Sequence, residues 1–498
     1  MAGVRAARAQ NADAGAPAQG GAAPSVTAPA DGGAAPEAVP AETGGGLFEQ
    51  SQAAASAGAA KSEAAAETKV PFTLSGYARG DTFIGKVPNA NAAEMKANYG
   101  ELALQLRTVK SAFGDGFADA RIRYGLQGAD QGTFVDLREA YVNGYLGPVD
   151  IRLGKQIIVW GRADALNPTN NLTPIDFRIR SPLEDDIRIG NVGARAFLRF
   201  SPVRLEGVWM PVYLATELPN VGLPEFVSFG PPKYPSLDLR NGLVAGRVHL
   251  ELPAFDMSVS YLRGYAPLPG LTVSSVTFDP VNPSLQVART AYNQQVVGFD
   301  FSTALGEVMT LRGEAAYRRP YDWQNKPYAA RPDLQYVIGA DHTFFGSLSV
   351  IGQYLGRYVF DWERVPLSAM PLDPNVLKMD PTDPTFDSNY WVPTVTDAAN
   401  LVLARTSQVL FNQTAQVQHV ATLRFDWLLA HETLSVSTLG LVNFTTKEWL
   451  VAPRIGYRFN DAMTAYVGAQ VFSGPTETLF GLIEEVLSAG YAELRYSF

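Results

Sequence analysis

Alternating segments dominate this sequence from about residue 70 to the last residue, Phe498. About 18 segments of about 10–14 residues place apolar side chains at every second position, and each ends at a turn signal. In "WLVAPRIGYRF", for example, Trp449, Val451 and Ile455 share one face, while Arg454 lies on the other. A period of two is the pattern of a β-strand whose two faces meet different surroundings. We therefore predict an all-β protein.

The length of the segments separates a soluble sandwich from a membrane barrel. Soluble strands average about 5–6 residues, whereas a tilted membrane strand needs about 9–11. An arginine facing lipid at the midplane costs about 2–4 kcal/mol, so the register must point the arginines of these segments toward a wet interior. The arginines expected to face inward are Arg107, Arg121, Arg123, Arg195, Arg199, Arg247, Arg312, Arg424, Arg454 and Arg458.

Connections between the segments alternate in length along the chain. The short ones are 114–116, 147–148, 201–202, 253–254, 305–306, 345–346, 430–431 and 460–461. The others, most of them long and polar, are 86–99, 128–132, 161–189, 214–240, 267–292, 319–333, 361–410, 443–447 and 474–483. Outer-membrane barrels have short periplasmic turns and long external loops. We predict a transmembrane antiparallel β-barrel of about 18 strands over residues 70–498, in the outer membrane of a Gram-negative bacterium.

The last strand ends on an aromatic residue. Leu494, Tyr496 and Phe498 share its apolar face. This pattern resembles the C-terminal signature of Gram-negative outer-membrane barrels, which implies that the barrel-assembly machinery reads it. The alternative is an aromatic terminus that arose by chance.

Residues 1–69 differ from the rest of the chain. Ala7-Arg8-Ala9 before Gln10 matches the small-residue cleavage site of a secretory signal, although no apolar stretch precedes it. We expect a signal-peptide remnant, with the true start upstream, followed by an Ala/Gly/Pro-rich periplasmic extension; the alternative is a disordered tail. Residues 10–46 lack the apolar side chains needed to fold, and 47–68 predict a short, marginal helix.

Composition narrows the class of protein. The absence of cysteine suits a chain that crosses an oxidising compartment. A net charge of −9 without a basic stripe argues against a nucleic-acid partner. No stretch of 18 or more apolar residues occurs, so no transmembrane helix is predicted.

The connection 161–189 is long and carries opposed charges. Because it also contains the apolar stretch "LTPIDF", we expect it to be ordered. We predict an inward-folded constriction loop whose charges set a field across the lumen; the alternative is a solvated surface loop with ion pairs of about 0–1 kcal/mol each. The predicted constriction and lumen residues are Arg162, Asp164, Asp176, Arg178, Arg180, Glu184, Asp185, Asp186, Arg188, Arg195, Arg199, Arg312 and Arg454.

The segments "LREAYVNGYLG" (137–147) and "LGKQIIVWGRADALNPTNNLTPID" (153–176) resemble a family of Gram-negative outer-membrane barrels of unknown function. The matching residues are Gly154, Lys155, Gln156, Trp160, Gly161, Asn167, Pro168 and Asp176. The resemblance implies a large, porin-like barrel that helps move hydrophobic compounds beside resistance-nodulation-division-type exporters, with a periplasmic or inner-membrane transport partner. The sequence departs from the family at Lys155, where Arg is common, and at Arg162, where the family has an acidic residue.

Other chemistry finds little support in the sequence. Asp373, Asp380, Asp383 and Asp387 cluster in the longest loop, but their spacing matches no calcium loop, and a solvated acidic loop is favoured. The four histidines have no metal spacing, and no nucleophile elbow, P-loop or HExxH motif occurs. We expect that the protein is not an enzyme and that it uses neither a metal nor a cofactor.

Two functions follow from a barrel of this size. The first is a channel or transport conduit for small anionic or amphipathic and hydrophobic compounds, since about 18 strands enclose an aqueous lumen unless it is filled. The alternative is a non-conducting barrel that acts as a surface receptor, adhesin or assembly platform. Outer-membrane lipids and lipopolysaccharide are expected partners. Six tyrosines are assigned to interfacial girdles, with the high strand propensity of tyrosine as the alternative explanation: Tyr77, Tyr99, Tyr124, Tyr261, Tyr457 and Tyr496.

Overall fold

The computed structural model describes residues 71–87, 92–128, 130–164, 166–219, 224–306, 309–366 and 374–498. The predicted signal-peptide remnant, the N-terminal extension and the helix over 47–68 lie outside the described residues. The same is true of Asp373 and of the side chain of Glu184.

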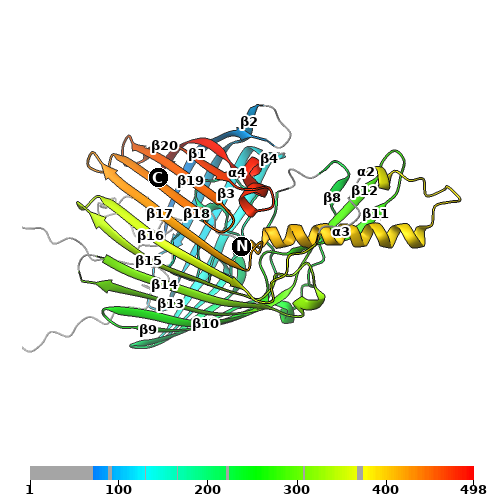
Figure 1. Cartoon of the computed structure of the whole chain (residues 1–498). Coiled ribbons are helices and arrows are strands. Elements are labelled where there is room, and N and C mark those ends of the chain that lie inside the picture. Colours follow the sequence, from blue (N-terminus) through cyan, green and yellow to red (C-terminus); the bar gives the residue numbers. More distant parts are fainter. Residues whose placement is uncertain are drawn as a thin grey trace, which may run out of the picture.

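The described chain forms a closed barrel of 18 strands, each antiparallel to its neighbours (Figure 1). The strands are β1 (Phe72–Lys86), β2 (Ala93–Thr108), β3 (Gly114–Gln127), β4 (Asp130–Leu146), β5 (Val149–Gln156), β6 (Asn191–Phe200), β7 (Val203–Met210), β9 (Leu243–Glu251), β10 (Phe255–Tyr265), β13 (Asn293–Leu305), β14 (Met309–Pro320), β15 (Asp333–Phe344), β16 (Leu348–Val359), β17 (Val417–Leu429), β18 (Leu434–Asn443), β19 (Glu448–Arg458), β20 (Met463–Ser473) and β21 (Ala489–Ser497). The predicted fold class and strand number are confirmed.

Strand β21 closes the barrel against β1. Their register runs from Tyr77 opposite Ser497 to Ile84 opposite Gly490. Beyond it, the backbones of Gly76 and Phe498 exchange two hydrogen bonds of 2.9 and 3.0 Å. The terminal aromatic residue is therefore part of the seam of the barrel.

Side chains alternate between the outer and inner surfaces as predicted. Leu494, Tyr496 and Phe498 face outward and are about half exposed. Outward aromatic residues gather near both rims, as in the interfacial belts of membrane proteins. Tyr124, Trp209, Tyr358, Phe444 and Trp449 lie toward the end with long loops, and Phe113, Phe200, Phe345, Trp427 and Phe459 toward the end with short turns.

Two of the six tyrosines assigned to the girdles point the other way. The hydroxyl of Tyr77 donates to Glu101 at 2.8 Å, and that of Tyr99 to the carbonyl of Arg180 at 2.5 Å. Both side chains belong to the inner face, where their hydroxyls find polar partners, so the girdle assignment is wrong for them.

The predicted alternation of short and long connections is present. Short connections join β2 to β3, β4 to β5, β6 to β7, β9 to β10, β13 to β14, β15 to β16, β17 to β18 and β19 to β20. The opposite end carries the connections that follow β1, β3, β5, β7, β10, β14, β16, β18 and β20. One predicted turn, 114–116, is wrong, because these residues begin β3 and pair with β4.

Three of the long connections fold together into an arm that projects from the barrel mouth (Figure 1). The arm contains a sheet of β8 (Val227–Phe229), β11 (Gly270–Thr277) and β12 (Ser284–Thr290), with α2 (Pro374–Leu377) and the long helix α3 (Ser388–Leu410). Their apolar side chains form a core of their own. The sequence predicted only polar loops here, because the parts of this core come from three separate segments.

The acidic residues of the longest loop serve local backbone structure. Asp380, Asp383 and Asp387 each accept a hydrogen bond from the backbone amide two residues later, at 2.8 to 3.0 Å, and Asp387 caps α3. The remaining helices among the described residues are η1 (Glu184–Ile187), η2 (Leu239–Asn241), η3 (Trp323–Asn325) and α4 (Leu479–Leu487). None of the helices in the described residues has the length and apolar character needed to cross a membrane.

Candidate functional site

The connection from β5 to β6, residues 157–190, crosses the inside of the barrel; we call it the constriction loop. Arg162 binds Asp256 of β10 and Asp300 of β13, each at 2.6 Å. Farther along, Asp164 accepts from Arg424 of β17 at 2.9 Å. Because these partners lie on the inner faces of strands spread around the barrel, the loop spans the lumen.

The far end of the loop is anchored to the opposite wall. Asp186 pairs with Arg79 of β1 at 2.7 Å and with Arg121 of β3 at 2.9 Å. Burial alone would raise the pKa of Asp186, but Arg79, Arg121 and Arg138 hold it well below the usual range of a carboxyl. Asp186 is therefore ionised at neutral pH and holds this part of the loop in place.

The family motif builds the first turn of the loop. Gly161 has φ of +104°, and a Cβ there would lie 1.9 Å from Oδ1 of Asn167, so only glycine fits. Glu314 of β14 accepts hydrogen bonds from the backbone amides of Arg162, Ala163 and Thr169 at 2.9, 3.2 and 2.6 Å. The turn that contains Pro168 thus wraps around one buried carboxylate.

The other motif residues attach the loop to the wall. Trp160 is buried, and its indole N–H donates to Glu206 of β7 at 3.0 Å. Gln156 donates to the carbonyl of Gly193 at 3.1 Å, and Lys155 lies 3.6 Å from Asp136. At Gly154, where φ is +134°, a Cβ would meet the backbone of β4. These contacts indicate a positioning role for the motif.

The second half of the loop contains the remaining predicted charges. Arg178 is half exposed and pairs with Asp176 at 2.8 Å. The buried Arg180 lies 3.5 Å from the carbonyl of Leu487, the last residue of α4, and Arg188 lies 3.4 Å from Asp185. The structure therefore brings Arg180 and Arg188 into the interior and leaves Arg178 in contact with solvent.

Inward arginines of the wall are matched by local partners. Arg195 binds Glu206 at 2.8 Å, Arg312 binds Asp341 at 3.2 Å, and Arg199 binds Asp150. The guanidinium of Arg454 lies 3.7 Å from the centre of the Tyr466 ring. All four face inward as predicted, and three of them have a carboxylate that compensates their charge.

One side of the lumen is apolar, which the sequence reading did not predict. Inward residues of β15 to β19, together with Phe472 and residues of α4, form a continuous cluster, and Ala163 and Leu166 of the constriction loop pack against it. The members on the strands are Val337, Leu355, Val420, Leu439, Leu441, Leu450, Ala452 and Phe472. The segment "WLVA" (449–452) could have indicated this apolar side, because apolar residues occupy both faces of the strand there.

Two cavities lie along this apolar side. The larger, with about 130 Å³ of free space, lies between the constriction loop, the inner faces of β13 to β19 and the first turn of α4. The smaller, about 40 Å³, is lined by Pro182 and Leu183 of the loop and by β17 to β21. Leu441 lines the larger cavity and Leu439 the smaller, so the two lie at successive levels along β18.

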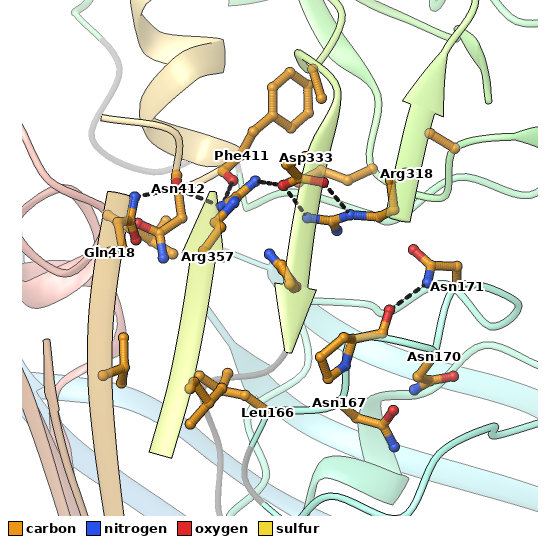
Figure 2. Close-up of a pocket in the computed structure, with 18 of the residues that line it drawn as sticks. Leu166, Asn167, Asn170, Asn171, Arg318, Asp333, Arg357, Phe411, Asn412 and Gln418 are labelled. Carbon is orange, nitrogen blue, oxygen red and sulfur yellow. Dashed lines mark hydrogen bonds and ion pairs between the residues drawn. The ribbon is translucent and has the colours of Figure 1, made fainter. Parts of the chain in front are cut away.

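Charged and amide side chains surround the larger cavity (Figure 2). Asp333 binds Arg318 through two contacts of 2.8 and 2.6 Å, and it also binds Arg357. Arg357 donates in addition to the carbonyl of Phe411, 2.7 Å away, at the end of α3. Sequence reasoning missed this triad, because its members are spread over three strands and carry no common motif.

Comparisons with known proteins agree with the resemblance seen in the sequence. A sequence model of the family described as "Protein of unknown function (DUF1302)" matches residues 47–230, which include the constriction loop. No curated protein matches the chain.

Three solved structures from Pseudomonas and Acinetobacter species have similar folds. OccK9 (OpdG) of Pseudomonas aeruginosa has 9% identity and a TM-score of 0.49, with 86% of this chain and 97% of that chain covered. A BenF-like porin of Pseudomonas fluorescens Pf-5 has 10% identity, a TM-score of 0.48 and coverage of 86% and 98%. OccAB1 of Acinetobacter baumannii has 7% identity, a TM-score of 0.47 and coverage of 86% and 96%.

Proposed function

We propose that this protein is a porin-like conduit of the outer membrane that passes small anionic or amphipathic compounds. The observation that supports it is the constriction loop, which crosses the lumen and is held by ion pairs on both sides, with cavities at two levels beside it. A loop that narrows the lumen and is fixed to the wall at both sides is a physical basis for selective passage.

The lining of the lumen supports amphipathic solutes more strongly than simple anions. Most inward arginines of the wall have carboxylate partners, so little uncompensated positive charge is offered there. The apolar side of the lumen is continuous from Val337 to Phe472 and adjoins both cavities. A solute with one apolar face and one polar face would match both sides of this path.

We also propose the orientation and partners of the barrel. The long loops and the projecting arm would face outward toward lipopolysaccharide, and the short turns toward the periplasm, as in outer-membrane barrels generally. Leu494, Tyr496 and Phe498 would be read by the assembly machinery, and a periplasmic or inner-membrane partner would hand over the solute. This is a transport role without catalysis.

The conduit is tested by planar-bilayer recordings of the refolded protein. We expect discrete conductance steps, and a changed cation-to-anion permeability ratio when Arg178, Arg180 and Arg188 are replaced together by Gln. Replacing Arg240, an exposed residue of η2, by Gln is the matched control and should leave the ratio as in the wild type. Wild-type selectivity in the triple variant would contradict the assignment of the constriction.

The projecting arm supports the second candidate, a non-conducting surface receptor, adhesin or assembly platform. Its sheet and α3 share an apolar core, which a simple connecting loop does not need. A correctly folded barrel that stays electrically silent over a wide range of voltages would favour this alternative over the conduit.

A further inference from the structure

The larger cavity contains amide groups that the protein itself does not use. Gln294 of β13 lines it, is only 4% exposed, and makes no side-chain hydrogen bond with the described residues. Asn170 of the constriction loop and Asn412 after α3 also line it, and each has a buried side-chain oxygen without a hydrogen-bond partner in the described part of the chain. Leaving such a group unpaired costs about 1–3 kcal/mol, so these positions indicate a missing partner.

These amides surround one space. Figure 2 shows Asn170 and Asn171 on one side of the cavity and Asn412 and Gln418 on the other, with Leu166 below. A side-chain amide offers both donors and an acceptor. A ligand between them would therefore need several groups that donate and accept, such as hydroxyls.

The charged groups around the same cavity are already engaged. Arg318 and Arg357 share Asp333, and Arg331 donates to the carbonyl of Asp361 at 2.7 Å. Glu448 accepts from the backbone amide of Phe480 at 2.6 Å. A charged ligand would have to break these contacts, whereas an uncharged one would leave them intact.

The apolar part of the cavity lining and the volume of the cavity fit a ring-shaped ligand. Leu166, Leu355, Val420, Leu441 and Phe480 supply an apolar surface for the C–H face of a ring. The free space of about 130 Å³ is close to the cavity of about 150 Å³ that holds one benzene molecule. The cavity thus has room for the atoms of one six-membered ring, and the hydroxyls on such a ring would lie against the surrounding amides.

We infer that this cavity binds an uncharged, polyhydroxylated ring compound of monosaccharide size. The inference rests on the proposed function for the solute's passage, but binding itself is measured separately. Gln294, Asn170 and Asn412 hydrogen-bond the hydroxyls of the ring, and the leucines and Phe480 contact its apolar face.

The test uses the full refolded chain with glucose and myo-inositol as probes, and glucuronate as a charged analogue of glucose. Binding is measured by titration calorimetry in detergent, and passage by block of single-channel current. Gln294→Leu and Asn170→Leu each remove an amide at nearly constant size and should weaken glucose or inositol binding about tenfold. Gln105→Leu is the matched control. Gln105 faces inward from β2, donates to Asp119 at 3.3 Å and lies outside the cavity lining. The affinity of this variant for the probes should stay within about twofold of the wild type.

The outcomes separate the two proposals. Binding of an uncharged probe by a silent barrel would support the cavity and overturn the conduit. A conducting barrel that binds neither probe, or that binds glucuronate more tightly than glucose, would overturn the inference. Equal affinity of the wild type and of both folded amide variants would also overturn the inference. Two variants are used so that the test still stands if one of them misfolds.

Discussion

The carboxylate of Asp186 in the constriction loop lies 2.7 Å from the guanidinium of Arg79 on β1, and both side chains are buried. The two residues are 107 positions apart in the chain. Their contact joins the far end of the loop to the strand at which the barrel closes, so the position of the loop depends on closure of the barrel.

We expect Asp186→Asn to lower the free energy of unfolding by about 1.5–3 kcal/mol, because two buried guanidinium groups lose a charged acceptor. Unfolding in urea, followed by tryptophan fluorescence, measures this change. Glu485→Gln is the control, since Glu485 and its partner Lys86 both have exposed side chains; its effect should stay within about 0–1 kcal/mol. Equal decreases in the free energy of unfolding would show that the buried ion pairs of Asp186 stabilise the protein no more than an exposed pair.

Glu314→Ala should release the first turn of the constriction loop. Three backbone amides lose their shared acceptor, so we expect faster hydrogen exchange at Arg162, Ala163 and Thr169. The control is Glu251→Ala, which removes an exposed carboxylate at the end of β9. It should leave hydrogen exchange in the constriction loop unchanged. Wild-type protection in Glu314→Ala would contradict the role of this carboxylate.

Gly161→Ala should be poorly tolerated. A residue with a Cβ is strained at a φ of +104°, and the added Cβ would lie 1.9 Å from Oδ1 of Asn167, so that side chain or the turn must shift. We expect a loss of about 1–3 kcal/mol in the free energy of unfolding. Gly144→Ala, where a Cβ meets no atom within 4 Å, is the matched control and should be close to neutral. Similar stability of the two variants would argue against a strained turn.

Lowering the pH should release the end of the constriction loop that Asp186 anchors, but only once this carboxylate becomes protonated. Because folding depresses the pKa of Asp186, its contribution is complete above the unfolded value of about 3.9 and is lost as the pH falls toward the folded pKa. The protection factors of residues 175–190, which are exchange rates corrected for the intrinsic effect of pH, should therefore stay constant between about pH 8 and 5 and fall below about pH 4. Asp186→Asn should lack this acid step; its persistence in the variant would assign the step to another group.

Much of the barrel could be predicted from sequence, because strand alternation is a local pattern. The inward orientation of Arg195 and Arg454, the outward orientation of Tyr496 and the parity of the connections all follow from a period of two. The loop 161–189 could be singled out by its length and charges, although its true bounds are 157–190.

The partners of these residues depended on tertiary structure. Glu314 and Asp186 carry no motif of their own, and each acquires its role only when the closed barrel brings distant strands and the loop together. The apolar side of the lumen and the arm likewise arise from segments that are far apart in the chain. The sequence by itself determined the outward face of most strands, because the alternation of apolar and polar side chains is local. The contents of the lumen were decided by closure of the barrel, because ion pairs and packing form only between surfaces that folding brings into contact.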